Sequence, residues 1–176
     1  MLSISNISLK RLQELKVCLL CPAMELLPKI HVRPMIEDDL DAVMAIEIAS
    51  YSSPWSHEHF RDELMSRYSW PFVAVETGNV VGYVCLMSLF EEAQILNIAV
   101  ALAHRGRGIA RMLLDHASTQ ALEKGAEIMA LEVRASNVAA ISLYEKLGFT
   151  RVGIRGGYYE STEDAILMEK PLKENS

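Results

Sequence analysis

Cysteine is scarce in this sequence, and its three copies form no even-numbered framework for disulfide bonds. Cys18 and Cys21 have the spacing of a metal-binding pair, but no second pair is present to complete a tetrahedral zinc site. Cys85 lies in an apolar segment, where we expect a core thiol in a strand. Free thiols persist in a reducing compartment, so the cysteine content predicts a cytoplasmic protein.

Long apolar runs are also missing, which predicts a protein without a membrane span. The apolar stretches fall well short of the ~20 residues that a membrane helix needs. Residues 1–29 carry Lys10, Arg11 and Lys16 ahead of the apolar residues 17–20, but this run is short and no small-residue cleavage pattern follows it. We therefore do not interpret the segment as a signal peptide.

Basic residues are not in excess, because 23 acidic residues face 17 basic ones and the net charge is -6. This balance argues against direct nucleic-acid binding and mildly favours a cationic substrate. The five histidines are scattered at positions 31, 57, 59, 104 and 116, and His57 and His59 would not share one face of a helix. No metal site is predicted.

The size of the chain suits one compact domain with a tail. It has 176 residues, of which 51% are hydrophobic, enough for a core. The first expected strand begins at Ile30, so we divide the chain into an N-terminal extension, residues 1–29, and one domain, residues 30–176. Met24 stands just before the domain, and two interpretations of the extension stay open: a weakly ordered tail, or a product of an upstream start.

Hydrophobic periodicity and capping residues predict the element order β-α-α-β-β-β-α-β-α-β-β. The first helix, 37–49, has an apolar stripe composed of Leu40, Val43, Met44, Ile46 and Ile48. Ser56 and Asn137 are expected to cap later helices, and Gly78-Asn79 is expected to turn a hairpin. The pattern indicates an α/β fold whose sheet has strands in both directions.

A glycine-bearing turn then leads from the strand ending at Val100 into a helix. The turn spans Arg105–Arg111, with glycine at 106 and 108, and a helix N-terminus of this kind presents backbone N–H groups that bind phosphate. The residues after the second glycine are not those of a Walker loop, and a dinucleotide fingerprint would need a third glycine. From spacing alone, a simple tight turn remains an alternative.

With its neighbouring motifs, this turn resembles the GNAT N-acetyltransferases, and one branch in particular, the bacterial ribosomal-protein-alanine N-acetyltransferases. The resemblance covers about Ile30 to Pro171. Its most specific blocks are Leu131–Asn137 and Tyr144–Phe149, and the other matching segments are Pro54-Trp55-Ser56, Asn97–Val100, Gly157-Tyr158-Tyr159 and Glu163-Asp164-Ala165. It implies a GNAT fold, with a mixed central sheet of about seven strands and helices on both faces.

The resemblance further implies acetyl-CoA as co-substrate, without a metal. The residues expected to bind it lie on one strand end, on the glycine turn and at a helix cap: Ile98, Ala99, Val100, Arg105, Gly106, Arg107, Gly108, Ile109, Ala110, Arg111 and Asn137. In the family, the turn's backbone amides hold the pyrophosphate, and the strand edge offers its N–H groups to pantetheine and to the thioester oxygen.

Two further residues are catalytic by the same resemblance. Glu132 would accept the proton of the attacking amine, and Tyr144 would protonate the departing CoA thiolate. From the residues alone, Glu132 is also compatible with a solvent-facing strand position, and Tyr144 with packing beside Ile141 and Leu147.

The implied acceptor is a protein N-terminus, most specifically the N-terminal alanine of a small-subunit ribosomal protein. Trp55, Tyr158 and Tyr159 are expected to lie in exposed turns, where each either walls the peptide groove or packs over the core. A monomer or weak dimer is expected. A broader N-terminal or lysine acetyltransferase, a small-amine acetyltransferase and a non-catalytic acetyl-CoA sensor are the alternatives.

Overall fold

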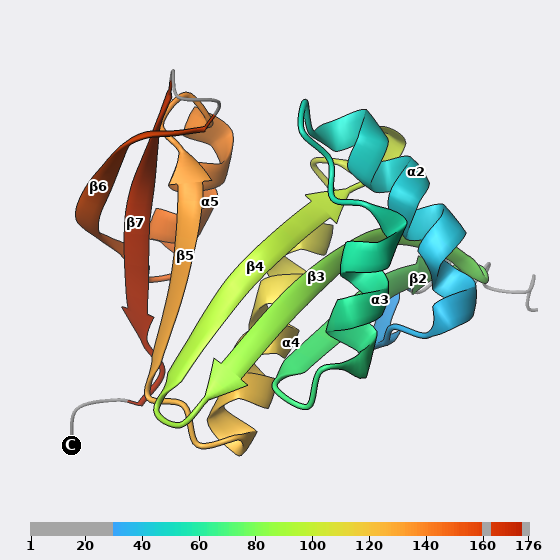
Figure 1. Cartoon of the computed structure of the whole chain (residues 1–176), viewed down its shortest axis with the longest axis horizontal. Helices are drawn as coiled ribbons and strands as arrows, with labels where there is room; N and C mark the ends of the chain where they lie inside the picture. Colours follow the sequence, from blue (N-terminus) through green and yellow to red (C-terminus); the bar gives the residue numbers. More distant parts are fainter. Residues whose placement is uncertain (1–29, 160–162, 174–176) are drawn as a thin grey trace, which may run out of the picture.

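The computed structural model describes residues 30–159 and 163–173. The predicted extension, residues 1–29, and with it Cys18 and Cys21, lies outside the described residues. The described chain forms a seven-stranded sheet in the order β1-β2-β3-β4-β5-β7-β6 (Figure 1). Neighbouring strands are antiparallel except β4 and β5, which are parallel. The predicted mixed sheet is confirmed.

The elements also follow one another in the predicted order. The strands are β1 (His31–Pro34), β2 (Ser69–Glu76), β3 (Asn79–Leu89), β4 (Glu92–Val100), β5 (Ile128–Arg134), β6 (Thr150–Tyr159) and β7 (Glu163–Pro171). The helices are α2 (Leu40–Ser50), α3 (His57–Met65), α4 (Ile109–Glu123) and α5 (Val138–Lys146), with single 3-10 turns η2 (Glu37–Asp39) and η3 (Leu102–His104).

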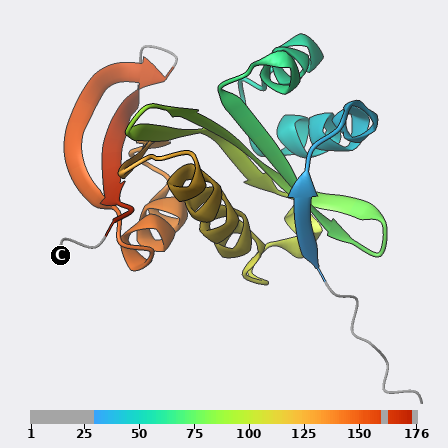
Figure 2. The same cartoon turned by 90° about the horizontal axis from the view of Figure 1, so that it is seen from below.

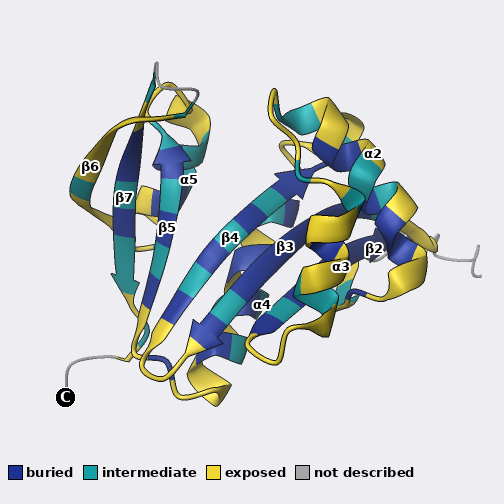
Figure 3. Ribbon diagram, viewed as in Figure 1, coloured by how far each residue is buried: buried dark blue, intermediate teal, exposed yellow. Residues whose placement is uncertain are grey.

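The helices cover both faces of the sheet. Helices α2 and α3 lie on one face, and α4 and α5 lie on the other (Figure 2). Each face has its own hydrophobic cluster: Phe60 and Tyr83 belong to the first, and Leu113 and Met129 to the second. Strands β2 and β3 are buried along most of their length, whereas β6 is largely exposed (Figure 3). The N-terminal strands therefore carry most of the core.

Helix α2 does not bury the whole stripe predicted for it. Leu40, Val43 and Ile46 are buried, but Ile48 is 61% exposed, and Glu47 is 1% exposed in its place. The helical period explains the correction, because residues 40, 43 and 47 lie along one line of the helix and residue 48 is turned away from it.

Local signals predicted the helix caps correctly and one turn incorrectly. The Ser56 hydroxyl accepts a hydrogen bond from His59 N–H, and the Asn137 side chain accepts one from Ala140 N–H. The β2–β3 hairpin, however, turns at Thr77-Gly78 and not at Gly78-Asn79. Both turn residues have positive φ, 48° and 84°, and the two-residue loop matches the twist of the strands on either side.

Cys85 is a fully buried core thiol in β3, as predicted, and burial raises its pKa well above the usual range.

Within the described ranges, none of the helices is long and apolar enough to cross a membrane.

Candidate active site

The site begins where β4 and β5 separate. The two strands pair in parallel only from Glu92 to Ile95 on β4, opposite Ile128 to Leu131 on β5. Directly after this segment, the register between β3 and β4 skips Leu96, which makes a β-bulge in β4. A bulge bends its strand, so the rest of β4 diverges from β5 and leaves a wedge-shaped opening between them (Figure 1).

The backbone of β4 faces into this opening. Ala101 N–H donates to Val81 in β3, so the alternate residues Ile98 and Val100 direct their backbone groups to the opposite side. Their carbonyls confirm this direction, since Ile98 O accepts from the Tyr51 hydroxyl at 2.6 Å and Val100 O accepts from Arg105 Nε at 3.0 Å.

A pocket of about 440 Å³ lies between the end of β4, the start of α4 and one side of α5. Gly108 is the N-cap of α4, with φ of 80°, and no side chain caps the helix. The first N–H groups of α4 therefore remain available for an anion, at the positive end of the helix dipole. This pocket is called the cofactor pocket below.

The residues predicted to bind acetyl-CoA converge on the cofactor pocket, with Arg107 as the exception. Those that line it are Ile98, Ala99, Val100, Arg105, Gly106, Gly108, Ile109, Ala110, Arg111 and Asn137. Their assembly from β4, α4 and the cap of α5 fits a long ligand with a phosphate at one end.

The three arginines of the turn are each engaged with the protein. Arg107 forms hydrogen bonds of 2.5 and 3.0 Å to Glu76, and these bonds are the largest cause of a lowered pKa of the Glu76 carboxyl. Desolvation opposes this effect, and the nearby His104 adds to it. Arg105 bridges the Val100 carbonyl and the Ser50 hydroxyl. Arg111 lies 3.5 Å from Asp115. The geometry thus gives Arg105 and Arg107 the task of holding the turn, while the turn's backbone faces the pocket.

A second pocket, of about 650 Å³, lies on the other side of the opening. We call it the acceptor pocket. It is lined by the C-terminal end of α2 and the loop after it, by β4 and β5, and by the aromatic end of β6. The two pockets share Ser50, Tyr51, Ile98, Asn137 and Tyr144, so a molecule in one can react with a molecule in the other at this junction.

Both predicted catalytic residues line the acceptor pocket, and Tyr144 also lines the cofactor pocket. The Glu132 side chain is 16% exposed and lies 3.0 Å from the Arg155 guanidinium. Tyr144 is 7% exposed and packs against Phe149, with 5.8 Å between ring centroids. Burial, with a smaller effect of Tyr159, raises the pKa of Tyr144 to about 12, so the phenol keeps its proton at neutral pH.

The three aromatic residues expected in turns lie in different elements of the structure. Trp55 lies in the loop before α3 and packs against Phe60 at 5.3 Å, and it also lines the acceptor pocket. Tyr158 and Tyr159 are not in a turn but end strand β6, with their rings 5.1 Å apart in an edge-to-face arrangement. Two glycines at 156 and 157 do not end the strand, which continues through both to Tyr159.

Sequence reasoning missed a buried polar cluster beneath the acceptor pocket. Glu47 accepts hydrogen bonds from the Tyr83 hydroxyl, from Asn97 Nδ2 at 3.2 Å and from Trp55 N–H at 2.8 Å. One carboxylate thereby joins α2 to β3, β4 and the loop that carries Trp55. The sequence could have predicted this cluster, because Glu47 falls on the apolar face of α2, where a carboxylate needs polar partners.

Tyr51, Arg134 and Arg155 were missed as well. The Tyr51 hydroxyl reaches β4, and burial raises its pKa. Arg134 lies 3.3 Å from Glu163 and stacks on the Tyr159 ring at 4.1 Å. Arg134 and Arg155 contact carboxylates on strands that are distant in sequence. No local sequence pattern could therefore predict their roles. In the described part of the chain no cluster of three or more histidine, cysteine, aspartate or glutamate side chains is placed to hold a metal.

A strand pair that opens over a glycine-led helix N-terminus defines a class of acyltransferase. The model of the Acetyltransferase (GNAT) family matches residues 40–149, and the chain belongs to this family. GNAT acetyltransferases use acetyl-CoA as acetyl donor.

Within this family, the chain is similar to enzymes that acetylate protein N-termini, as their names state. The chain is 37% identical over 148 residues to a putative [ribosomal protein bS18]-alanine N-acetyltransferase of Bacillus subtilis, covering 83% of this chain and 98% of that one. It is 36% identical over 149 residues to an N-alpha-acetyltransferase of Saccharolobus solfataricus, covering 77% and 89%.

The crystal structure of the ribosomal-protein-S18-alanine N-acetyltransferase from Escherichia coli superposes with a TM-score of 0.78 at 32% identity, covering 84% of this chain and 97% of that one. The NatC complex bound to Gag peptide and CoA contains a chain that superposes with a TM-score of 0.74 at 26% identity, covering 82% and 99%. The GNAT fold predicted from the sequence is confirmed.

Proposed function

We propose that this enzyme transfers the acetyl group of acetyl-CoA to the N-terminal α-amine of a protein, and that its acceptor is the N-terminal alanine of ribosomal protein bS18. The observation that carries the proposal is the junction of the two pockets, with Glu132 on the acceptor side and Tyr144 on both. The names of the similar bacterial enzymes support the choice of acceptor.

Acetyl-CoA would supply a thioester carbonyl that an amine can attack. An α-amine has a reference pKa of about 7.7 to 8.0 and is mostly protonated at neutral pH, so a base must take its proton. Glu132 lies in the acceptor pocket, mostly buried, and is the carboxylate that we assign to this task.

Charge that develops on the thioester oxygen requires a hydrogen-bond donor. The backbone N–H groups of Ile98 and Val100 point into the opening, and such preorganised donors stabilise an oxyanion strongly. Tyr144 retains its proton and lies at the junction, where it can donate to the departing sulfur. The turn at Gly106 and Gly108, with the first N–H groups of α4, would hold the pyrophosphate.

The proposal also implies a location and a form. A cytoplasmic protein would keep Cys85 as a free thiol, and an acceptor with a cationic N-terminus suits the net charge of -6. We expect a monomer or weak dimer.

Mass spectrometry of peptides incubated with the enzyme and acetyl-CoA tests this function. We expect one acetyl group on the α-amine of a peptide with the bS18 N-terminus, and a loss of at least about 100-fold in kcat for the Glu132→Gln variant with acetyl-CoA binding retained. Glu92→Gln, an exposed change at the far end of β4, is the matched control.

Other outcomes would redirect the proposal. Acetylation of many N-termini or of lysines would support a broader N-terminal acetyltransferase, the alternative that the archaeal relative favours. Acetyl-CoA binding without peptide acetylation would leave a small-amine enzyme or a sensor. A fully active Glu132→Gln variant would remove Glu132 from the role of base.

A further inference from the structure

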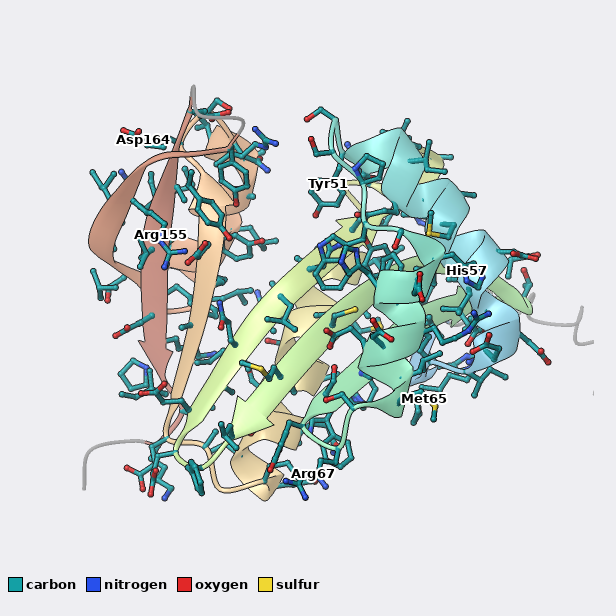
Figure 4. The ribbon with its side chains drawn as sticks, viewed as in Figure 1. Tyr51, His57, Met65, Arg67, Arg155 and Asp164 are labelled. Atoms are coloured by element: carbon teal, nitrogen blue, oxygen red, sulfur yellow. The ribbon has the colours of Figure 1, made fainter. Side chains whose placement is uncertain are left out.

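The Glu132 carboxylate is contacted by an arginine from a strand that is not its neighbour. Glu132 lies on β5 and Arg155 on β6, with β7 between them. Arg155 Nη1 is nevertheless 3.0 Å from Glu132 Oε1. Figure 4 shows the Arg155 side chain lying over β7 toward β5.

The strand register explains how Arg155 reaches across. Arg155 and Arg134 are both paired with Ala165 of β7, and Glu132 is paired with Leu167. Paired residues share a face of the sheet, so Arg155 and Glu132 project from the same side. Because Ala165 has only a methyl group and is fully buried, it leaves a path over β7 for the long arginine side chain.

The arginine is itself held in place. The Arg155 guanidinium stacks on the Tyr158 ring, 4.9 Å from its centroid, and Tyr158 lines the acceptor pocket. The guanidinium thus contacts a ring on β6 and a carboxylate on β5. These two contacts restrict where it can lie. Glu132 lines the acceptor pocket and Arg155 does not, so the carboxylate remains accessible to the acceptor.

We propose that Arg155 is a positioning residue, which holds Glu132 in the orientation that receives the proton of the acceptor amine. The inference rests on the proposed function, because it takes Glu132 to be the base. An arginine that binds one carboxylate oxygen fixes it and leaves the other oxygen for the substrate. It also keeps a charged partner beside a side chain that is only 16% exposed, where an unpaired carboxylate is costly.

The same strand offers a contrasting ion pair. Arg151, also on β6, lies 3.0 Å from Glu145 of α5, and their side chains are 55% and 47% exposed. Exposed pairs contribute little, commonly under about 1 kcal/mol. The Arg155 side chain is similarly exposed, at 52%, but its partner Glu132 is only 16% exposed and lines the acceptor pocket.

Steady-state kinetics of the full chain with acetyl-CoA and the bS18-type peptide tests the inference. We expect Arg155→Gln to lower kcat about 10- to 100-fold, since small misplacement of a reacting group has costs of this order, with the peptide KM and the acetyl-CoA Kd changed by less than about threefold. Arg155→Lys keeps the charge and should recover most of kcat. Arg151→Gln should behave as the wild type.

A double variant separates positioning from a general structural role. If Arg155 acts through Glu132, Arg155→Gln should cause no further loss in a Glu132→Gln background, because residues that act as a unit are not additive. A wild-type rate for Arg155→Gln, or losses that multiply in the double variant, would overturn the inference.

A structural measurement tests the inference independently of turnover. Crystal structures of the wild type and of Arg155→Gln should show the Glu132 carboxylate in one orientation in the first and displaced in the second. An undisplaced Glu132 in the variant would overturn the inference. A wild type that acetylates no peptide would instead contradict the proposed function.

Discussion

Burial determines what Tyr144 can do in the reaction. Its phenol is enclosed between α5 and the two pockets, and the raised pKa of about 12 means that proton loss begins only in strongly alkaline solution. A phenol donates a hydrogen bond only while it is protonated, so Tyr144 stays competent as a donor throughout the range in which the acceptor amine loses its own proton.

This setting predicts both a variant effect and a pH profile. Tyr144→Phe keeps the ring, so we expect a fall in kcat of about 100-fold with little change in peptide KM. In the wild type, kcat/KM should rise as the α-amine deprotonates near pH 8 and should not fall again below about pH 10, because Tyr144 remains protonated there. Initial rates from pH 6.5 to 10 measure both effects.

Tyr68→Phe is the control for that measurement, since Tyr68 is 39% exposed and lines neither pocket. A Tyr144→Phe enzyme that works at the wild-type rate would show that the departing thiolate takes its proton elsewhere.

At the scale of the elements, one carboxylate joins α2 to two strands of the sheet by hydrogen bonds, beside the apolar packing of the helix. Glu47 accepts hydrogen bonds from Tyr83, Asn97 and the Trp55 backbone. Tyr83 and Asn97 are remote from Glu47 in sequence. Removing the acceptor would leave several buried donors without a partner, and each such group costs about 1–3 kcal/mol.

Glu47→Leu is therefore expected to lower the free energy of unfolding by about 3 kcal/mol or more. Urea denaturation followed by circular dichroism measures this change. Asp41→Leu, at an exposed position of the same helix, should alter stability by less than about 0.5 kcal/mol. Equal stability of the Glu47 variant and the wild type would mean that the cluster contributes nothing to holding α2.

Elements whose signals are local were predictable from the sequence. The side chains of Ser56 and Asn137 accept hydrogen bonds from backbone N–H groups within one helical turn. Glycines at 106 and 108 predict a turn whatever the tertiary structure of the rest of the chain, and both have positive φ. The contact of Arg107 with Glu76 joins the glycine turn to the end of β2, which lies far from it in sequence. The contact of Arg155 with Glu132 depends on the register of β5, β7 and β6. A one-residue slip in one of these strands would turn its side chain to the other face, so no local rule could find this contact.

At the scale of the whole molecule, the described residues place both hydrophobic clusters and both pockets in one fold. We accordingly propose that residues 30–176 form the catalytic domain and that residues 1–29 are an extension to it.

A chain shortened to residues 30–176, preceded by a start methionine, is expected to retain kcat/KM within about threefold of the full-length value, since all the described lining residues of both pockets are kept. Parallel assays of the two chains with the bS18-type peptide measure the ratio. A loss of more than about tenfold, with the midpoint of thermal unfolding unchanged, would show that the extension takes part in acceptor binding.

The short pairing of β4 with β5 has a consequence for how the chain folds. Antiparallel strands β2, β3 and β4 follow one another through tight turns, and β6 and β7 form a second hairpin, so each of these sets closes only short loops. Strand β5 pairs with β7, and its pairing with β4 joins the two sets across the intervening helix α4, with only the segment Glu92–Ile95 to offset the entropy of a longer loop. We therefore expect this pairing, whose few contacts leave room for two substrates, to form after the antiparallel hairpins.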